Sequence, residues 1–190
     1  AQMASLTTAQ VQALTTQQIA ALEVPDLIAL DSAQFAALTN PQLGALTASQ
    51  AAALGTEDLA QLSAAQVAAI GTEALAALST DVIVGLGTDQ VAGLTTMQLR
   101  ALSNAQVAAL ASDDLNALGS TQVRAFSLGQ VAALGTDQLA ALGSTQVQAL
   151  STAQLRAIDA DDLAALGTAQ VQALSAAQIA GLAPAQVAAM

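Results

Sequence analysis

Residues 15–22 read Thr-Thr-Gln-Gln-Ile-Ala-Ala-Leu, and this eight-residue pattern decides the fold. A large apolar residue recurs at every eighth position from Leu6 to Met190 without loss of register, and it is Leu at 20 of the 24 positions. We number the slots of each repeat one to eight, so that slot eight holds this residue. The chain then contains 23 complete repeats from residue 7 to residue 190, which predicts a linear stack of similar small units.

A short α-helix in each repeat is the conformation that fits the pattern. In one continuous helix, eight residues at about 100° each would rotate successive slot-eight side chains by about 80°, so they would find no common partner. A β-strand would need apolar residues at alternate positions, but the apolar positions are slots five, seven and eight. The frequent Ala and Gln residues also favour helix over sheet.

Slots one and four have the residues of a helix capping box. Slot one is Ser or Thr in 11 repeats and slot four is Gln in 17, so the hydroxyl and the amide can cap the first turn reciprocally. Slot one is Gly in seven other repeats, as at Gly55, Gly87 and Gly135. We expect these glycines to take the left-handed conformation that closes the preceding helix, so that one residue ends one helix and begins the next.

The prolines and charges support this placement. Pro25, Pro41 and Pro184 all lie in slots two or three, where the first turn of a helix tolerates proline. All fourteen acidic residues lie in slots one to four and all three arginines in slot six, which complements the helix dipole. We therefore expect helices of about six or seven residues. The arginines are separated by whole numbers of repeats, three and then four, and could lie along one side of the stack: Arg100, Arg124 and Arg156.

The predicted fold class is all-α, a solenoid or superhelix of very short capped α-helices, one per eight-residue repeat. Slots five and eight should point inward, Ala at slot seven should allow close helix contact, and slots three and six should face solvent. The pattern leaves open how many helices make one turn. We expect residues 1–190 to form a single continuous array without a domain boundary or capping repeats. Residues 87–134 resemble residues 135–182, through either duplication or superhelical geometry.

Composition excludes several kinds of partner. The net charge is −11, with no Lys, His, Cys, Trp or Tyr, so we expect no binding to nucleic acid or to an anionic membrane surface. Residues 163–190 carry no charge, but Gln, Thr or Ser recurs in every repeat there, and we expect no membrane insertion. The start of the chain shows no secretion signal, and because residue 1 is not Met, we expect a processed chain or a piece of a longer one.

The reactive side chains are too few for catalysis. No catalytic constellation exists, so we expect no enzyme activity, no cofactor and no small-molecule substrate. The candidate metal ligands are Asp159, Asp161 and Asp162, whose oxygens would suit calcium. Their spacing does not match an EF-hand loop, and a capped helix start explains them equally, so we expect no metal. The threonine-rich corners raise a further alternative, an ice-binding surface.

The motif resembles a known class of repeat. Residues 133–139, Ala-Leu-Gly-Thr-Asp-Gln-Leu, and residues 150–155, Leu-Ser-Thr-Ala-Gln-Leu, are similar to the Ala-Leu-Thr-Thr-x-Gln-(Val/Ile) arrays of very large exported bacterial surface or adhesin-like proteins. The resemblance implies an extracellular or cell-surface location and a structural role, and it supplies no functional residues.

The function predicted from these features is a non-enzymatic structural repeat protein, a rod, stalk or filament-forming segment. Because the terminal repeats are as apolar as the central ones, we expect end-to-end self-association or continuation of the array in a longer chain. The alternative is a solenoid scaffold that binds a protein or peptide. Surface slots diversified with aromatic or charged residues would favour that alternative, but slots three and six hold mostly Ala, Gln and Asp.

Overall fold

The computed structural model describes residues 2–190, and this part of the chain consists of 23 short α-helices and one 3-10 helix, without a strand. Each complete repeat contributes one α-helix, so α1 belongs to the first repeat and α23 to the last. The predicted all-α class with one helix per eight residues is therefore confirmed. The chain divides into two compact units, Ala1–Leu102 and Ser103–Met190, which are described separately.

The helices are four to six residues long, slightly shorter than expected. The first unit contains η1 (Met3–Ser5), α1 (Thr8–Gln12), α2 (Thr16–Ala21), α3 (Val24–Leu27), α4 (Ser32–Ala36), α5 (Asn40–Gly44), α6 (Ala48–Ala51), α7 (Thr56–Ala60), α8 (Ala64–Ala69), α9 (Thr72–Ala77), α10 (Thr80–Val84), α11 (Thr88–Ala92) and α12 (Thr96–Ala101). The second contains α13 (Asn104–Ala109), α14 (Ser112–Ala117), α15 (Ser120–Ala125), α16 (Leu128–Ala132), α17 (Thr136–Ala141), α18 (Ser144–Ala149), α19 (Thr152–Ala157), α20 (Ala160–Leu163), α21 (Thr168–Ala173), α22 (Ala176–Ala180) and α23 (Pro184–Ala189).

The corners between helices are built from two extended residues, one in slot eight and one in slot one. Between α8 and α9, Ile70 has φ −61° and ψ 133°, and Gly71 has φ −59° and ψ 147°. Within residues 2–190 no residue, glycine included, has a positive φ. The prediction that slot-one glycines close the preceding helix in a left-handed conformation is therefore wrong. Two to four residues, rather than one, separate successive α-helices, which accounts for the shorter helices.

The capping boxes form as the sequence predicts. In α2, the backbone N–H of Gln18 donates to Thr15 Oγ1 at 3.2 Å, and the backbone N–H of Thr15 donates to Gln18 Oε1 at 2.8 Å. The three prolines occupy the first two positions of their helices, as expected for residues without a backbone N–H. Side-chain caps thus satisfy groups that such short helices would otherwise leave unpaired.

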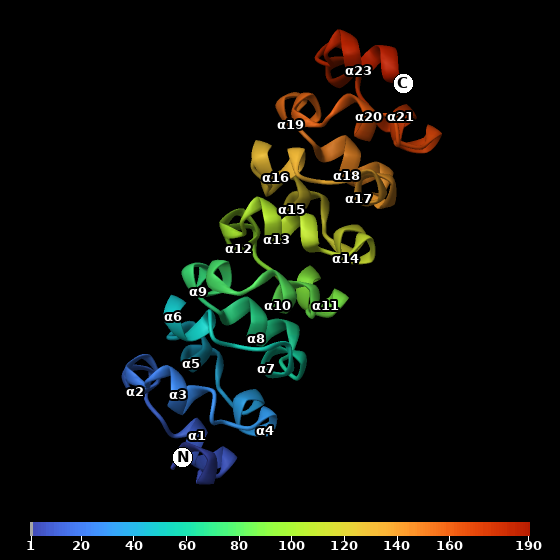
Figure 1. The fold of residues 1–190 in the computed structure, drawn as a ribbon. Helices are drawn as coiled ribbons and strands as arrows, with labels where there is room; N and C mark the ends of the chain where they lie inside the picture. Colours follow the sequence, from blue (N-terminus) through green and yellow to red (C-terminus); the bar gives the residue numbers. More distant parts are fainter. Residues whose placement is uncertain (1) are drawn as a thin grey trace. The chain divides into compact units, whose positions relative to one another are not determined.

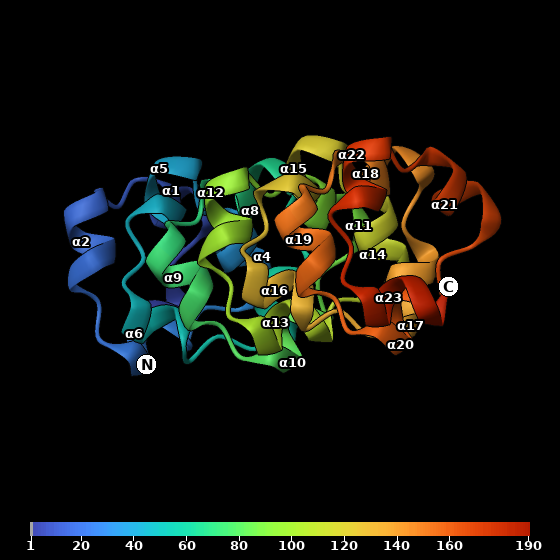
Figure 2. The same cartoon turned by 90° about the horizontal axis from the view of Figure 1, so that it is seen from above.

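Three helices make one turn of the stack. Helices in contact are three apart in chain order, as in α3 with α6, α6 with α9, and α9 with α12 in the first unit. Of these, α6, α9 and α12 follow one another along one side of that unit (Figure 1). In the second unit, α16 lies beside α19 in both views (Figures 1 and 2). One turn therefore consists of three repeats, a number that the sequence pattern left open.

This period bears on two features of the sequence. The similarity between residues 87–134 and residues 135–182 extends over six repeats, which equals two turns. Arg124 and Arg156 are separated by four repeats, which is not a whole number of turns. These arginines accordingly lie in α15 and α19, which belong to different columns of stacked helices. The expectation that the arginines share one side is wrong for this pair.

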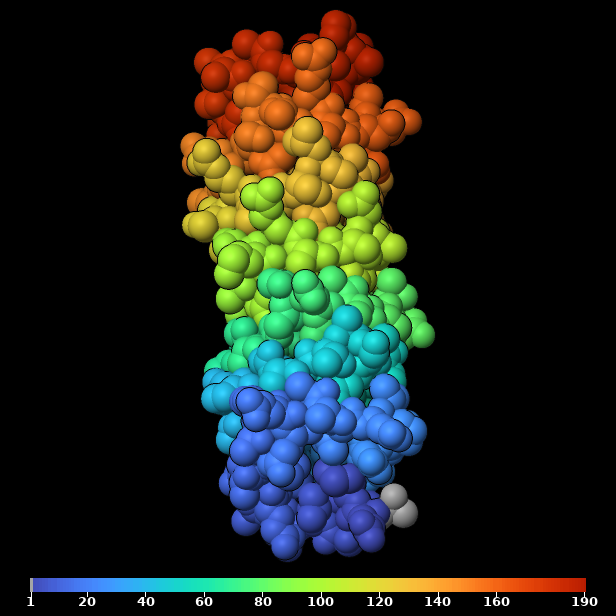
Figure 3. Space-filling view, turned by 90° about the vertical axis from the view of Figure 1, so that its left-hand side faces the viewer, coloured from blue at the N-terminus to red at the C-terminus, as the bar shows by residue number. Residues whose placement is uncertain are grey.

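The core consists of slots five and eight, as predicted. In slot five, Leu43, Leu99 and Leu139 are fully buried, and the slot-eight residues Leu38 and Leu134 are almost so. Slot three is exposed in every repeat except at the half-buried Gly129, and slot six is exposed or half-buried throughout. Within each unit, the surface shows bands of colour in chain order, because each turn contacts only its neighbours (Figure 3).

Candidate functional site

The slot-four glutamines are buried side chains that cap their own helices. Gln146 is 4% exposed, and its Oε1 accepts a hydrogen bond from the backbone N–H of Gly143 at 2.6 Å. This is the amide half of the predicted capping box, and it forms although glycine offers no hydroxyl in return. Burial of the polar amide requires partners for its NH2 group as well.

The NH2 group of the same side chain reaches the previous turn. Gln146 Nε2 donates to the carbonyl oxygens of Leu115 at 2.8 Å and Leu118 at 2.6 Å, at the C-terminal end of α14. One side chain thus caps the start of its own helix and the end of a helix four repeats earlier. We call a residue in this arrangement a turn-bridging glutamine.

The bridge recurs throughout both units. In every case Nε2 donates to the carbonyl of the slot-eight residue that lies four repeats earlier in the chain. Within the two units the turn-bridging glutamines are Gln34, Gln42, Gln50, Gln66, Gln90, Gln98, Gln138, Gln146, Gln154, Gln170, Gln178 and Gln186. Since helices of four to six residues leave most of their carbonyls without intrahelical partners, this repeated donor satisfies a large share of the buried backbone.

The sequence pattern predicted these glutamines as caps of their own helices but not their contact with the previous turn. The residues in slot four nevertheless contain an indication of this contact. A capping box accepts Glu as readily as Gln, yet slot four is never Glu in 23 repeats. An ionised carboxylate only accepts hydrogen bonds, whereas an amide both accepts and donates. The exclusion of Glu therefore indicates a need for the NH2 group.

Carboxylates in slot four make part of the bridge. Asp58 Oδ2 accepts from the backbone N–H of Gly55 at 2.8 Å, as Gln would. Asp162 Oδ1 accepts from Thr136 Oγ1 at 2.6 Å, which joins α20 to α17 one turn earlier. These repeats keep a cap or a contact between turns, but the carboxylate cannot donate to a carbonyl.

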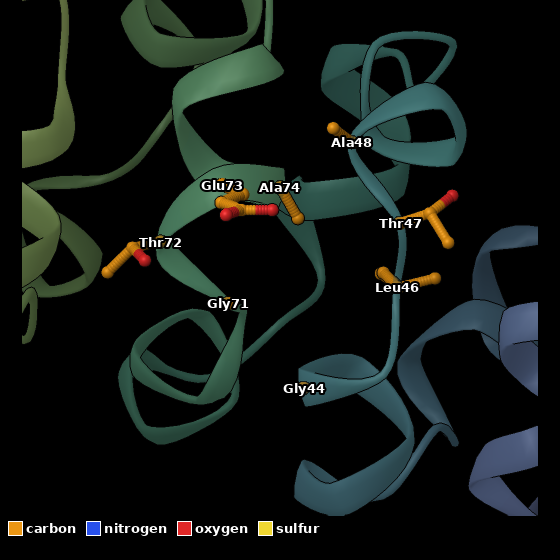
Figure 4. Close-up of a pocket in the computed structure, with 8 residues that line it drawn as sticks. All are labelled: Gly44, Leu46, Thr47, Ala48, Gly71, Thr72, Glu73 and Ala74. Carbon is orange, nitrogen blue, oxygen red and sulfur yellow. The ribbon is translucent and has the colours of Figure 1, made fainter.

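Ala74, at the start of α9, leaves the bridge open. A glutamine here would donate to the carbonyls of Leu43 and Leu46, which correspond in register to the acceptors of the other bridges. A hollow of about 460 Å³ lies between the start of α9 and residues 46–48 (Figure 4), and hollows of about 550 and 320 Å³ lie at the same register beside Gln90 and Gln178. In the close-up, Ala74 lies across from that segment, and Thr47 turns its side chain away from α9. The hollow therefore recurs with or without a slot-four glutamine, and what α9 lacks is the glutamine's hydrogen bonds to the previous turn.

The calcium candidates are placed at the start of α20. Asp159 Oδ1 accepts from the backbone N–H of Asp161 at 3.0 Å, so Asp159 acts as a helix cap. Asp162 bonds Thr136, and Asp161 is exposed. Residues 2–190 contain no group of three or more His, Cys, Asp or Glu side chains that could hold a metal ion. No helix in the same part of the chain is long and apolar enough to cross a membrane.

Short capped helices, a turn of three helices and bridges between turns define an α-helical repeat protein of solenoid type. The family model described as "ALTTAQ repeat" matches seven overlapping segments of the chain, which are residues 19–56, 51–88, 67–104, 83–115, 107–144, 131–161 and 155–190. The chain belongs to the ALTTAQ repeat family. No curated protein matches it.

The six letters of the family description correspond to slots seven and eight of one repeat followed by slots one to four of the next. Residues 165–170, Ala-Leu-Gly-Thr-Ala-Gln, differ from them at one position. In this segment Leu166 lies in the core, Gly167 begins the helix, and Gln170 bridges to the carbonyls of Leu139 and Leu142 at 2.9 and 2.6 Å. The family pattern therefore contains the residues that hold one turn on the next.

Proposed function

We propose that this chain is a non-enzymatic structural repeat protein, a rod, stalk or filament segment of a bacterial extracellular or cell-surface protein. The observation that carries the proposal is the turn-bridging glutamine, because the most regular polar side chain of the repeat caps its own helix and holds that helix to the previous turn. The exposed slots three and six hold mainly Ala, Gln and Asp, residue types that are uncommon at binding hot spots.

Electron microscopy of the purified chain tests the structural role. A stack in which each turn contacts only its neighbours should grow in one dimension, so elongated particles are expected. Compact particles at every concentration would contradict the proposal. A pull-down that returns one stoichiometric partner would instead favour the scaffold function.

The extracellular location is a separate part of the proposal. It is supported by the resemblance to repeats of exported bacterial proteins, and the acidic, Lys-free and Cys-free composition is compatible with export. Antibody labelling of intact cells of the source organism should detect the repeat at the surface or in the medium. Labelling only after lysis would place it inside the cell and refute this part.

A further inference from the structure

Two successive helices inside the first unit, α9 and α10, lack the bridge to the previous turn. Their slot-four residues are Ala74 and Val82, whose side chains can neither donate nor accept a hydrogen bond. The helices before and after them are bridged, because Gln66 and Gln90 donate to slot-eight carbonyls four repeats earlier at 3.0 and 2.6 Å. Residues 71–86 are therefore an internal pair of repeats without a turn-bridging glutamine.

The backbone groups that such a glutamine would join are present at both positions. The carbonyls of Leu46 and Leu54 correspond in register to the acceptors, and the backbone N–H groups of Gly71 and Ser79 stand at the starts of α9 and α10. None of these four groups has a hydrogen-bond partner among residues 2–190. They therefore add no hydrogen bond between the turns.

The capping of these two helices is also incomplete. α9 begins at Gly71, which has no hydroxyl, and without a slot-four amide it forms neither half of the capping box. α10 keeps one half, because the backbone N–H of Val82 donates to Ser79 Oγ at 3.3 Å. By contrast, α7 lacks a glutamine but keeps a cap through Asp58, which accepts from the backbone N–H of Gly55 at 2.8 Å. The loss of both bridge and cap lowers the local stability of α9 most.

A repeat of the second unit isolates the effect of slot four. Residues 71–78 read Gly-Thr-Glu-Ala-Leu-Ala-Ala-Leu and residues 135–142 read Gly-Thr-Asp-Gln-Leu-Ala-Ala-Leu, so they differ only in slots three and four. Their slot-five residues, Leu75 and Leu139, are both fully buried. Gln138 adds a hydrogen bond to its own cap at 3.0 Å and one to the previous turn at 2.7 Å. Opening either repeat exposes the same apolar side chains, so these hydrogen bonds make the difference.

We infer that residues 71–86 form a local unfolding unit, in which α9 and α10 open together while the rest of the first unit stays folded. Segments with fewer stabilising hydrogen bonds open at lower free energies than the whole protein. The buried Leu75 and Ile83 keep the segment packed in the closed state. The array thus has a defined internal place that yields to heat, tension or a protease before the unit unfolds. The inference concerns local stability and does not depend on the proposed structural role.

Hydrogen exchange of the whole chain, followed by mass spectrometry at pH 7, measures the opening. After correction for intrinsic rates, the amides of residues 71–86 should exchange about fivefold faster than those of residues 135–150, a pair of repeats in which both bridges form. Low concentrations of urea should accelerate the exchange of residues 71–86 less than that of the slowest amides, because a local opening exposes less surface than global unfolding.

Three variants separate the role of slot four from that of slot three. Ala74→Gln supplies the amide and should slow exchange about fivefold in both α9 and α10, because they open together. Glu73→Asp removes the other difference between the two matched repeats and should leave the exchange rate unchanged. Gln138→Ala makes the reciprocal change and should accelerate exchange of residues 135–142 at least about fivefold. Circular dichroism checks that each variant keeps its helix content.

Several outcomes would overturn the inference. Equal protection of residues 71–86 and 135–150 in the unmodified chain would show that the missing bridges do not weaken the segment. A urea dependence equal to that of the slowest amides would show that the segment opens only by global unfolding. An Ala74→Gln variant that exchanges like the unmodified chain, or a Glu73→Asp variant that slows exchange equally, would show that the absent amide is not the cause.

Discussion

At the scale of single residues, the repeat depends on the two-sided chemistry of the glutamine amide. The oxygen of Gln146 accepts from the backbone of its own helix, and its nitrogen donates to the carbonyls of Leu115 and Leu118. Asparagine is shorter, and a carboxylate has no donor at neutral pH. The slot therefore favours glutamine, present in 17 of the 23 repeats, for chemical reasons as well as for size.

Replacement of this donor by an acceptor should be costly. Gln146→Glu removes the hydrogen bonds to two carbonyls and leaves a buried carboxylate facing them, so we expect a loss of at least about 3 kcal/mol in the free energy of unfolding at pH 7. Gln148→Glu makes the same change at an exposed neighbour and should cost within about 0.5 kcal/mol. Urea denaturation of the two variants measures the difference, and equal losses would contradict the bridge.

The loss in the free energy of unfolding caused by Gln146→Glu should depend on pH. Burial beside carbonyls raises the pKa of the introduced carboxyl in the folded state above its unfolded value of about 4.3. Its contribution to stability is then fully present below about pH 4.3 and is lost as pH rises through the folded pKa. The difference in free energy of unfolding between Gln146→Glu and Gln148→Glu should therefore become smaller on acidification, because the protonated carboxyl can again donate a hydrogen bond. A gap independent of pH would count against this assignment.

Substitution of a slot-one glycine should stabilise the protein rather than destabilise it. Gly135 has φ −84° and ψ 171°, and a Cβ added there would meet nothing within 4 Å. Gly135→Ser should supply the missing hydroxyl cap and reduce the freedom of the unfolded chain, raising the free energy of unfolding by about 0.5–1 kcal/mol. Thermal unfolding followed by circular dichroism measures the gain.

Gly181 is the matched control for Gly135. A Cβ there would overlap Thr152 Cγ2, because slot seven of one turn packs on slot two of the previous turn. Gly181→Ala should therefore destabilise the protein, by about 1–3 kcal/mol. Stabilisation at both glycines, or at neither, would refute the distinction between a free corner and a close contact.

At the scale of the helix, each element is too short to be stable by itself and obtains its stability from neighbouring turns. Close approach requires small residues between turns, which explains Ala or Gly in slot seven of 22 of the 23 repeats. Gly85 next to Thr56 and Gly93 next to Ala64 show the same contact as Gly181 next to Thr152. The predicted role of slot seven in close packing is thus confirmed.

The missing bridge at α9 can be supplied by one substitution. Ala74→Gln should add hydrogen bonds to the carbonyls of Leu43 and Leu46, raising the free energy of unfolding by about 1 kcal/mol after the loss of side-chain entropy. Ala65→Gln, in an exposed slot three, adds the same side chain without partners and should change stability by less than about 0.5 kcal/mol. Chemical denaturation of both variants measures the effect, and no gain at residue 74 would contradict the bridging geometry.

At the scale of the whole molecule, most repeats carry both a donor for the previous turn and acceptors for a later one. Removal of one complete repeat, residues 135–142, should therefore join two compatible ends and preserve cooperative thermal unfolding with the same helix content per residue. Removal of only residues 139–142 deletes the core slots of one repeat and should lower both helix content and melting temperature. Circular dichroism of the two deletions tests this, and equal damage from both would refute register-based stacking.

The sequence predicted the local structure almost completely. Capping residues, prolines and charges each indicate a position within a single helix, and the apolar slots indicate which side of it is buried. All of these patterns depend on interactions within one repeat. The corner was mistaken because glycine at slot one fits two conformations, and Gly71 with φ −59° shows that the extended one is used. Local composition alone does not separate a helix-ending glycine from a helix-starting one.

One helix per eight residues, its caps and its inward slots were determined by the sequence itself, because they depend on hydrogen bonds and periodicity within one repeat. The three-helix turn and the second contact of residues such as Gln146 were decided only by the tertiary structure. They join residues that lie three or four repeats apart, and near-identical repeats give no local indication of which later repeat will lie beside which. Packing of the turns makes that choice.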